Sequence, residues 1–106
     1  MTTFSSHVLD AARGGPAVGV HLELRDAAGS VVATARTDGD GRFRLDGEIA
    51  GGPHDLVIAA GDYHAAVGTP TFLTRVVLGF EVDPAQEHYH VALLLSPFAC
   101  TAYRGS

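Results

Sequence analysis

The sequence predicts an all-β protein, a sandwich of about eight strands with one short helix. Three observations support this fold class. Apolar and polar residues alternate with the period of two that half-buried strands show, turn residues recur at short intervals, and only one segment has the composition of a helix. The chain has 106 residues, enough to bury a core without disulfides or metal, so residues 1–106 are expected to form one domain.

The first half of the chain contains alternating segments that are bounded by turns. His7 and Leu9 fall on one face of the first segment, while Val8 falls on the other. Residues 38–41, Asp-Gly-Asp-Gly, are a strong turn signal, and residues 47–53 are expected to be a loop. The expected strands are residues 6–10, 18–25, 31–37 and 42–45.

The second half of the chain contains the only good helix candidate. Residues 61–68 carry an acidic residue near their start and several small residues, which is compatible with about one or two helical turns. A turn over residues 96–99 then separates the last two strands. The expected strands are residues 56–60, 76–82, 88–95 and 100–104.

Charge and composition argue against several classes of partner. The formal net charge is −5, and the seven basic residues are all arginines that form no basic run, so nucleic-acid binding is not expected. No apolar run approaches the roughly 20 residues of a membrane span, and the first residues do not read as a secretory leader, so a cytoplasmic location is expected. Cys100 is the only cysteine, which leaves no partner for an internal disulfide.

The predicted strand over residues 88–95 is unusual because both of its faces are largely apolar. Its odd-numbered residues form a face that belongs to the core, whereas Ala92 and Leu94 continue the opposite face beyond His88 and His90. A two-layer sandwich covers only one face of each sheet, so this second face needs another cover, most simply a second copy of the protein. We therefore expect an oligomer with this face in a subunit interface; the alternative is a face open to solvent.

Three sequence blocks occur in order along nearly the whole chain. They are His7-Val8-Leu9-Asp10 with Gly14-Gly15-Pro16-Ala17, then Thr37-Asp38-Gly39-Asp40-Gly41-Arg42, and an ending that reads HYHV, LLLSP and YRGS within residues 88–106. In this combination the chain resembles the 5-hydroxyisourate hydrolases, the enzymes related to transthyretin. Transthyretin shares the opening and the leucines before Ser-Pro, but the hormone carriers lack these histidines, this arginine and the YRGS end.

The chain also departs from the family pattern. Ser6 stands where the family usually has Thr, Ala92 stands where it usually has Pro, and Ala99-Cys100 replaces a Gly-Tyr pair. Residues 72–75 replace a more usual aromatic-Pro-Glu run. None of these departures removes a residue that is expected to do chemistry, and Ala92 and Cys100 are expected to reshape the pocket wall only modestly.

The resemblance implies a fold, an assembly and a reaction. The fold is a transthyretin-like sandwich of two four-stranded sheets with one short helix, assembled as a homotetramer with the site at a subunit interface. The reaction is the opening of 5-hydroxyisourate by water at its N1–C6 amide, which gives 2-oxo-4-hydroxy-4-carboxy-5-ureidoimidazoline in urate degradation, a part of purine catabolism. The family needs no metal, and no metal or cofactor is expected here.

Five residues are candidates for the site. His7 and His90 are assigned to water activation and proton shuttling, since an imidazole with a pKa of about 6.5 can accept or donate a proton near neutral pH; which of the two is the base is left open. Arg42 is expected to orient the substrate and to stabilise the oxyanion that develops at C6. Tyr103 is expected to donate a hydrogen bond to the substrate or to wall the site, and the resemblance places the carboxylate of Ser106 in the groove.

The remaining candidates are expected to have other roles. His88 shares a face with His90 and is expected to lie at the rim of the site. His21, His54 and His64 are expected at the surface. Asp10 is expected to accept hydrogen bonds at the end of a strand rather than to act as an acid.

Two other functions remain open from the sequence. In a zinc hydrolase, His88 and His90 would chelate the metal from one face of a strand and His7 would supply a third ligand, although the charge of Arg42 opposes a cation. In a non-enzymatic binding module or transthyretin-like carrier, residues 37–45 would be the turn of a small sandwich domain, which they also resemble. Turnover and metal content distinguish these functions from a metal-free hydrolase.

Overall fold

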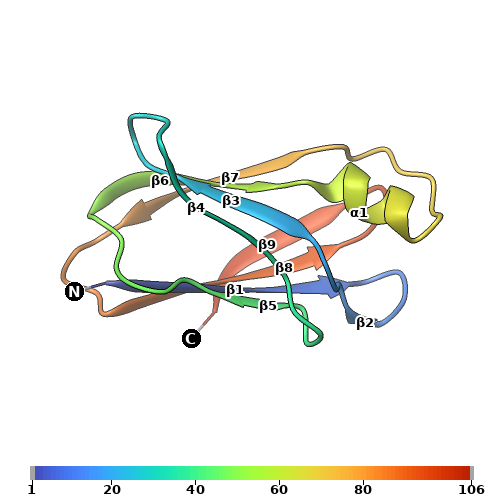
Figure 1. Ribbon diagram of the computed structural model, residues 1–106, viewed down its shortest axis with the longest axis horizontal. Helices are drawn as coiled ribbons and strands as arrows, with labels where there is room; N and C mark the ends of the chain where they lie inside the picture. Colours follow the sequence, from blue (N-terminus) through green and yellow to red (C-terminus); the bar gives the residue numbers. More distant parts are fainter. Residues whose placement is uncertain (1, 106) are drawn as a thin grey trace.

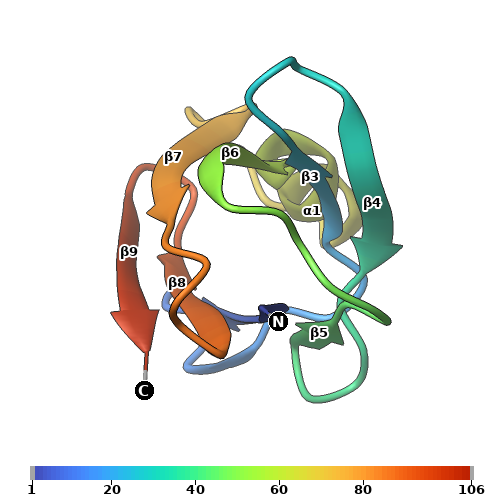
Figure 2. The same ribbon diagram turned by 90° about the vertical axis from the view of Figure 1, so that its left-hand side faces the viewer.

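The computed structural model describes residues 2–105, which form two β-sheets packed face to face with a short helix at one end (Figure 1). Figure 2 shows the sheets as facing layers, with β7 near β9 along one side and β4 near β5 along the other. The elements are β1 Thr3–Asp10, β2 Gly15–Pro16, β3 His21–Arg25, β4 Val31–Arg36, β5 Arg42–Arg44, β6 Gly52–Ile58, α1 Ala60–Ala66, β7 Val76–Val82, β8 His88–Leu95 and β9 Cys100–Gly105.

The first sheet has the order β2-β1-β8-β9, with β5 also paired to β1. The long strands β1 and β8 lie side by side in parallel, from Thr3 opposite His88 to Asp10 opposite Leu95. The other edge of β1 is shared by two short antiparallel strands, because β5 pairs with the first half of β1 and β2 with its end. The first and last strands of the chain thus lie on either side of β8.

The second sheet is antiparallel throughout and has the order β4-β3-β6-β7. Its inner face meets that of the first sheet in one core, where Phe4 of β1 stacks on Phe80 of β7 with 5.7 Å between ring centroids. Burial alternates strictly along β1, as the period of two requires. Burying a large apolar side chain contributes roughly 1.5–3 kcal/mol, so this shared core is the main source of stability. The largest fully buried apolar side chains are Phe4, Leu22, Leu24, Leu56, Ile58, Leu93 and Leu95.

The all-β sandwich that the sequence predicts is confirmed, and strands β7 and β8 have the predicted bounds. The first sheet has five strands rather than four, because the two-residue β2 is too short to leave a periodic pattern. Strand β3 starts three residues later than predicted, since Val18 is 52% exposed and lies before the strand. Strand β6 starts at Gly52, inside the predicted loop.

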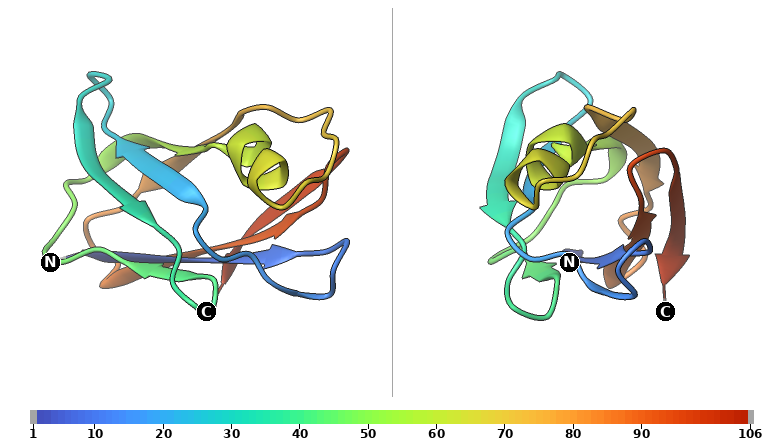
Figure 3. Two further views of the ribbon diagram at one scale, coloured as in Figure 1. Left: turned by 45° about the vertical axis from the view of Figure 1, so that its right-hand side comes forward. Right: turned by 90° about the vertical axis from the view of Figure 1, so that its right-hand side faces the viewer.

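Two of the histidines that were expected at the surface are buried, so this prediction is wrong for them. His54 is 4% exposed; its Nδ1 donates a hydrogen bond to the carbonyl of Gly52, and its ring packs against Phe80. His64 is 1% exposed and lies edge-on to Tyr63 in α1, where the helix covers the end of the sandwich (Figure 3). Sequence alternation does not reveal this burial, because it comes from packing between the layers.

Asp10 joins β1 to the helix through three accepted hydrogen bonds, which confirms its expected role as an acceptor. Its Oδ1 accepts from the backbone N–H groups of Ala12 and Arg13, and its Oδ2 accepts from the hydroxyl of Tyr63 at 2.6 Å. Burial alone would raise the pKa of this carboxyl, but the hydrogen bonds to Tyr63 and to the backbone outweigh burial and lower it. Asp10 is therefore a charged, fully paired anchor at the end of β1.

No helix within residues 2–105 is long and apolar enough to cross a membrane.

We predict that Tyr63→Phe lowers the melting temperature. The change leaves the buried Asp10 Oδ2 without the one side-chain donor that residues 2–105 provide for it, which costs about 1–2 kcal/mol of folding free energy. In a domain of this size each kcal/mol corresponds to roughly 4–8 °C. Thermal unfolding followed by circular dichroism at one protein concentration measures the shift. Tyr103→Phe is the matched control, because that side chain is 55% exposed. Equal melting temperatures for the two variants would contradict the anchoring role of Asp10.

Candidate active site

The candidate site lies on the outward face of the first sheet, where neighbouring strands place polar side chains in rows. Residues paired across neighbouring strands point to the same face. One row runs from Arg42 through His7 to Ala92 and Tyr103. The next row runs from Arg44 through Ser5 to His90 and Gly105. Residues from four strands, far apart in the sequence, thus come together on one surface.

Arg42 is held by a tight turn that Asp38 closes. One carboxylate oxygen of Asp38 accepts hydrogen bonds from the backbone N–H groups of Asp40 and Arg42, both at 2.9 Å. These two hydrogen bonds outweigh a small burial effect and lower the pKa of Asp38. Gly41 has a φ of +75°, and a Cβ there would lie 2.4 Å from the carbonyl oxygen of Val8. Only glycine fits this turn, which starts β5 with Arg42 at the site.

His7 is tied to the same turn. Its Nε2 lies 2.9 Å from the carbonyl oxygen of Asp40, and since a carbonyl can only accept, Nε2 carries the proton of this bond. In the neutral ring, Nδ1 is then the nitrogen that remains available to a ligand. The position of His7 therefore depends on the turn that also positions Arg42.

His90 is half-buried between β1 and β9. Its Nδ1 lies 2.7 Å from the hydroxyl of Ser5, and its ring lies over Gly105. A Cβ on Gly105 would come within 2.6 Å of the His90 Cδ2, so the glycine leaves the space that the ring occupies. The glycine of the YRGS ending thus has a steric role in the site.

The pKa of His90 is lowered from the ordinary value for histidine. Burial is the largest cause, because it disfavours the charged form, and the positive charge of Arg42 adds to it, followed by charge on His7 and His88. His90 is consequently an uncharged imidazole at neutral pH and can accept a proton.

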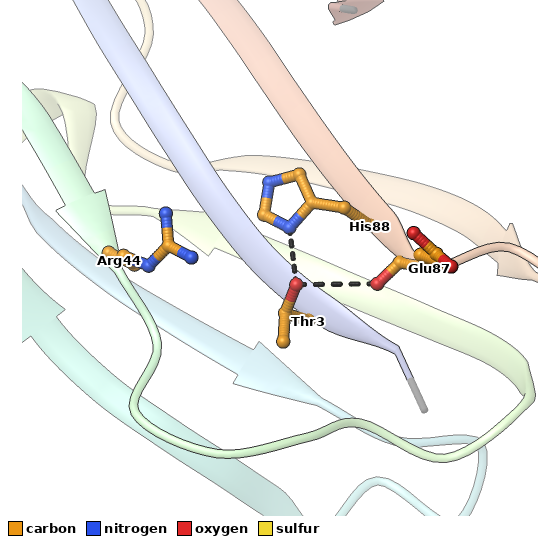
Figure 4. Close-up of a pocket in the computed structure, with 4 residues that line it drawn as sticks. All are labelled: Thr3, Arg44, Glu87 and His88. Atoms are coloured by element: carbon orange, nitrogen blue, oxygen red, sulfur yellow. Dashed lines mark hydrogen bonds between the residues drawn. The ribbon is translucent and has the colours of Figure 1, made fainter.

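Two adjoining grooves open on this face. The first, of about 250 Å³, brings Arg42 and His90 together; its lining residues are Ser5, Ser6, Asp38, Arg42, Phe43, Arg44 and His90. The second, of about 460 Å³, is lined by Thr3, Arg44, Glu87 and His88, and Figure 4 shows the guanidinium of Arg44 and the ring of His88 facing this space. Arg44 lines both grooves and joins them.

The structure thus brings some of the predicted site residues together and separates others. Arg42 and His90 share a groove, and His7 lies next to Arg42 in the row beside that of His90. Tyr103 is on the same face but lines a different groove of about 180 Å³ near the edge of the sandwich. Ser106 lies outside the described residues, so its predicted role stays a prediction.

Sequence reasoning missed three residues of the site, namely Ser5, Asp38 and Gly105. Each acts through a contact that is long-range in sequence or specific to one turn, and a periodic pattern contains no such information. The one available sign that these residues matter was the position of Asp38 and Gly105 within the blocks that carry the family resemblance.

The chemistry of the groove is that of proton transfer beside a fixed positive charge. A neutral imidazole can take a proton from water, and a guanidinium can stabilise an oxyanion formed nearby. Within residues 2–105, no three His, Cys, Asp or Glu side chains are arranged to hold a metal ion. Both ring nitrogens of His88 are engaged by hydroxyl groups, so this histidine does not present a free nitrogen for the zinc site that its spacing from His90 allows.

Comparison with known sequences gives one family over nearly the whole chain. The profile of the HIUase/Transthyretin family matches residues 4–105. The 5-hydroxyisourate hydrolase of Pseudomonas aeruginosa is 43% identical over 117 residues, covering 100% of this chain and 93% of that protein. The 5-hydroxyisourate hydrolase of Caulobacter vibrioides is 42% identical over 115 residues and covers 100% of both chains.

Comparison with solved structures gives the same fold. The Klebsiella pneumoniae 5-hydroxyisourate hydrolase superimposes with a TM-score of 0.91 at 30% identity, over 100% of this chain and 94% of that one. Sea bream transthyretin in complex with thyroxine superimposes with a TM-score of 0.88 at 30% identity, over 96% of this chain and 93% of that one. The fold alone is therefore shared by a hydrolase and a thyroxine-binding protein.

We predict that Gly41→Ala destabilises the protein by about 2 kcal/mol or more, because alanine is strained at this φ and its Cβ meets the carbonyl of Val8. Gly39→Ala is the matched control in the same turn, since a Cβ there meets no atom within 4 Å. Urea unfolding of the two variants measures the difference. Equal midpoints would show that the turn tolerates a side chain at Gly41 and does not fix Arg42 in this way.

Proposed function

The chain belongs to the HIUase/Transthyretin family, and we propose that it is a hydrolase that opens the ring of 5-hydroxyisourate in urate degradation. Relatives named 5-hydroxyisourate hydrolase align with its full length at about 40% identity. The observation that carries the proposal is the groove in which the guanidinium of Arg42 and the neutral imidazole of His90 meet. A fold that is also found in a thyroxine-binding protein does not by itself decide for an enzyme, whereas this pair of groups provides hydrolytic chemistry.

The first step is the attack of water on C6. The water oxygen forms a bond to C6 while one of its protons passes to the unprotonated nitrogen of His90. Such a proton transfer contributes about 10²–10⁴-fold to the rate. The lowered pKa of His90 supports this role, because it keeps the base in its neutral form at neutral pH.

The negative charge that develops on the C6 oxygen is stabilised by Arg42. Its guanidinium provides several N–H donors in a planar fork, which suits a flat substrate rich in carbonyl oxygens. The turn closed by Asp38 supports this role by fixing the backbone from which Arg42 extends. Because this backbone is fixed before the substrate binds, only the side chain of Arg42 has to settle on the substrate.

In the last step the C6–N1 bond breaks. The electron pair of the bond goes to N1, the proton held by His90 is delivered to N1, and His90 returns to its neutral form. The new carboxylic acid at C6 loses its proton to solvent and leaves as a carboxylate. His7 is proposed to exchange a proton with the substrate or to accept a hydrogen bond from it through Nδ1, since Nε2 is bound to Asp40.

The proposed assembly is a homotetramer with the site at a subunit interface. Beyond the two histidines of β8, the same outward face continues with Ala92 and Leu94, and Leu94 is 37% exposed in the single chain. Tyr103 lies beside Ala92 and is proposed, with Ser106, to contact the substrate. A second copy packed on this face would bury the apolar part and close the open side of the groove. The cytoplasmic location expected from the sequence stays a prediction.

We predict that the protein accelerates the decay of 5-hydroxyisourate. Fresh substrate made from urate with urate oxidase loses its ultraviolet absorbance spontaneously, and the wild type should raise this rate. His90→Ala should lower kcat by about 10²–10⁴-fold, because the proton acceptor is removed. His21→Ala, on the other sheet, is the matched control and should keep the wild-type rate. A wild-type rate equal to the spontaneous rate would refute the proposed function, and full activity in His90→Ala would refute the role of His90.

We also predict the pH dependence of kcat/KM. The base must be neutral, and its pKa lies below the ordinary value of about 6.5, so activity should persist at pH 6.5 and fall only at lower pH. Arg42→Gln removes a positive charge that depresses this pKa, so the residual activity of that variant should begin to fall at a higher pH. Initial rates between pH 5 and 8, corrected for spontaneous decay, measure both curves. An acid limb at or above pH 6.5 in the wild type would contradict the assignment.

A further inference from the structure

A chain of hydrogen bonds leads from the start of β1 to the proposed base. The hydroxyl of Thr3 lies 2.5 Å from Nδ1 of His88, and Nε2 of His88 lies 2.8 Å from the hydroxyl of Ser5. The same Ser5 oxygen lies 2.7 Å from Nδ1 of His90. Two hydroxyls and two imidazoles therefore alternate along the register that places Thr3 opposite His88 and Ser5 opposite His90.

The direction of proton donation along these hydrogen bonds is set at Thr3, the outer end of the hydrogen-bond chain. The Thr3 hydroxyl also lies 3.3 Å from the backbone carbonyl of Glu87, and it donates to that oxygen because a carbonyl can only accept. A hydroxyl has one proton, so Thr3 must accept at its other contact, and the Nδ1 of His88 carries the proton there (Figure 4). In the neutral ring of His88, Nε2 is then an acceptor.

The direction of the hydrogen bonds at Ser5 follows from the acceptor role of His88 Nε2. Because Nε2 of His88 accepts, the single hydroxyl proton of Ser5 is donated to it, and the Ser5 oxygen accepts at its other contact. That contact is Nδ1 of His90, which therefore carries the proton of the neutral ring. The remaining nitrogen, Nε2 of His90, is left with a free lone pair.

We propose that Thr3, His88 and Ser5 are positioning residues that fix His90 in the tautomer with the proton on Nδ1, so that Nε2 is the general base. The role of Nε2 as a base rests on the proposed function. The tautomer of His90 does not, because it is a property of the protein alone. It selects His90 over His7 as the residue that takes the proton from water. It gives His88 a structural reason for its place beside His90, since both of its ring nitrogens are used within the hydrogen-bond chain.

The surroundings of His90 agree with a neutral ring. The groups that face it are Arg42 and Arg44 from β5, His7 from β1, His88 from its own strand and Gly105 from β9. Asp38 lines the same groove, but its carboxylate accepts hydrogen bonds from the backbone N–H groups of Asp40 and Arg42. The charges that act on His90 are the positive ones of Arg42, His7 and His88, which oppose an imidazolium. A hydroxyl as the partner of Nδ1 orients the ring without adding the negative charge that a carboxylate would bring.

The direct test is the tautomer of His90 in the wild-type protein. Long-range ¹H–¹⁵N spectra of ¹⁵N-labelled protein at pH 7.5 distinguish a protonated from an unprotonated ring nitrogen, and His90→Gln identifies the signals of His90. We expect Nδ1 to be protonated and Nε2 to be unprotonated. A spectrum with the proton on Nε2 would overturn the proposal, whatever the activity of the protein.

Variants of Ser5 test whether the hydrogen-bond chain determines the tautomer of His90. Ser5→Ala should move the proton of His90 towards Nε2 and lower kcat by on the order of 10- to 100-fold, with a smaller effect on KM. Ser5→Thr keeps the hydroxyl and should restore both the tautomer and kcat. Ser30→Ala, in the exposed turn between β3 and β4, is the matched control and should change neither.

The outcomes separate this inference from the proposed function. If wild-type protein does not turn over 5-hydroxyisourate but His90 carries its proton on Nδ1, the proposed function fails while the assigned tautomer stands. If the wild type is active and Ser5→Ala, folded as judged by its melting curve, keeps the wild-type tautomer and kcat, Ser5 does not position His90 and the proposal is overturned. Should Ser5→Ala fail to fold, the wild-type spectrum still tests the tautomer of His90, and Ser5→Thr still tests whether a hydroxyl at this position maintains it.

Discussion

The parallel pairing of β1 with β8 is the constraint on which the site depends. It places Ser5 opposite His90 and His7 opposite Ala92, so the first and next-to-last long strands contribute to one surface. A slip of one residue would turn Ser5 and His7 into the core and would expose Phe4 and Val8, which are fully buried. The core on the inner face therefore fixes the register, and the register fixes the polar contacts on the outer face. Stability and function are thus two consequences of the same alternation.

A tight turn adds the second part of the site. Asp38 and Gly41 shape the turn so that β5 starts at Arg42, next to His7. The carbonyl of Asp40 in the same turn accepts a hydrogen bond from His7, so one local structure orients this imidazole and fixes the backbone of Arg42. This charge then acts on the neighbouring row, where it helps burial to keep His90 neutral. The arrangement of the site residues is therefore determined by a sheet register and a turn rather than by a flexible loop.

Much of the fold could be predicted from the sequence because strand alternation and turn residues are local signals. The His-x-His spacing of His88 and His90 also placed both side chains correctly on one face. The roles of Ser5 and Gly105 could not be predicted, because each depends on which strand lies beside β8 and in which register. The burial of His54 and His64 was missed for a related reason, since it arises where separate elements pack together. Local patterns therefore predicted the strands, and long-range pairing determined the site.

Groups from β1, β5 and β8 are proposed to form a single substrate site that a second copy of the chain closes. A crystal structure of the assembled protein with xanthine, a stable planar purine that resists hydrolysis, would show whether this site exists. We expect the purine within hydrogen-bond distance of His90 Nε2 and of the Arg42 guanidinium, with the outward face of β8 covered by another subunit. A purine bound away from these two residues, or an assembly that leaves this face open to solvent, would contradict it.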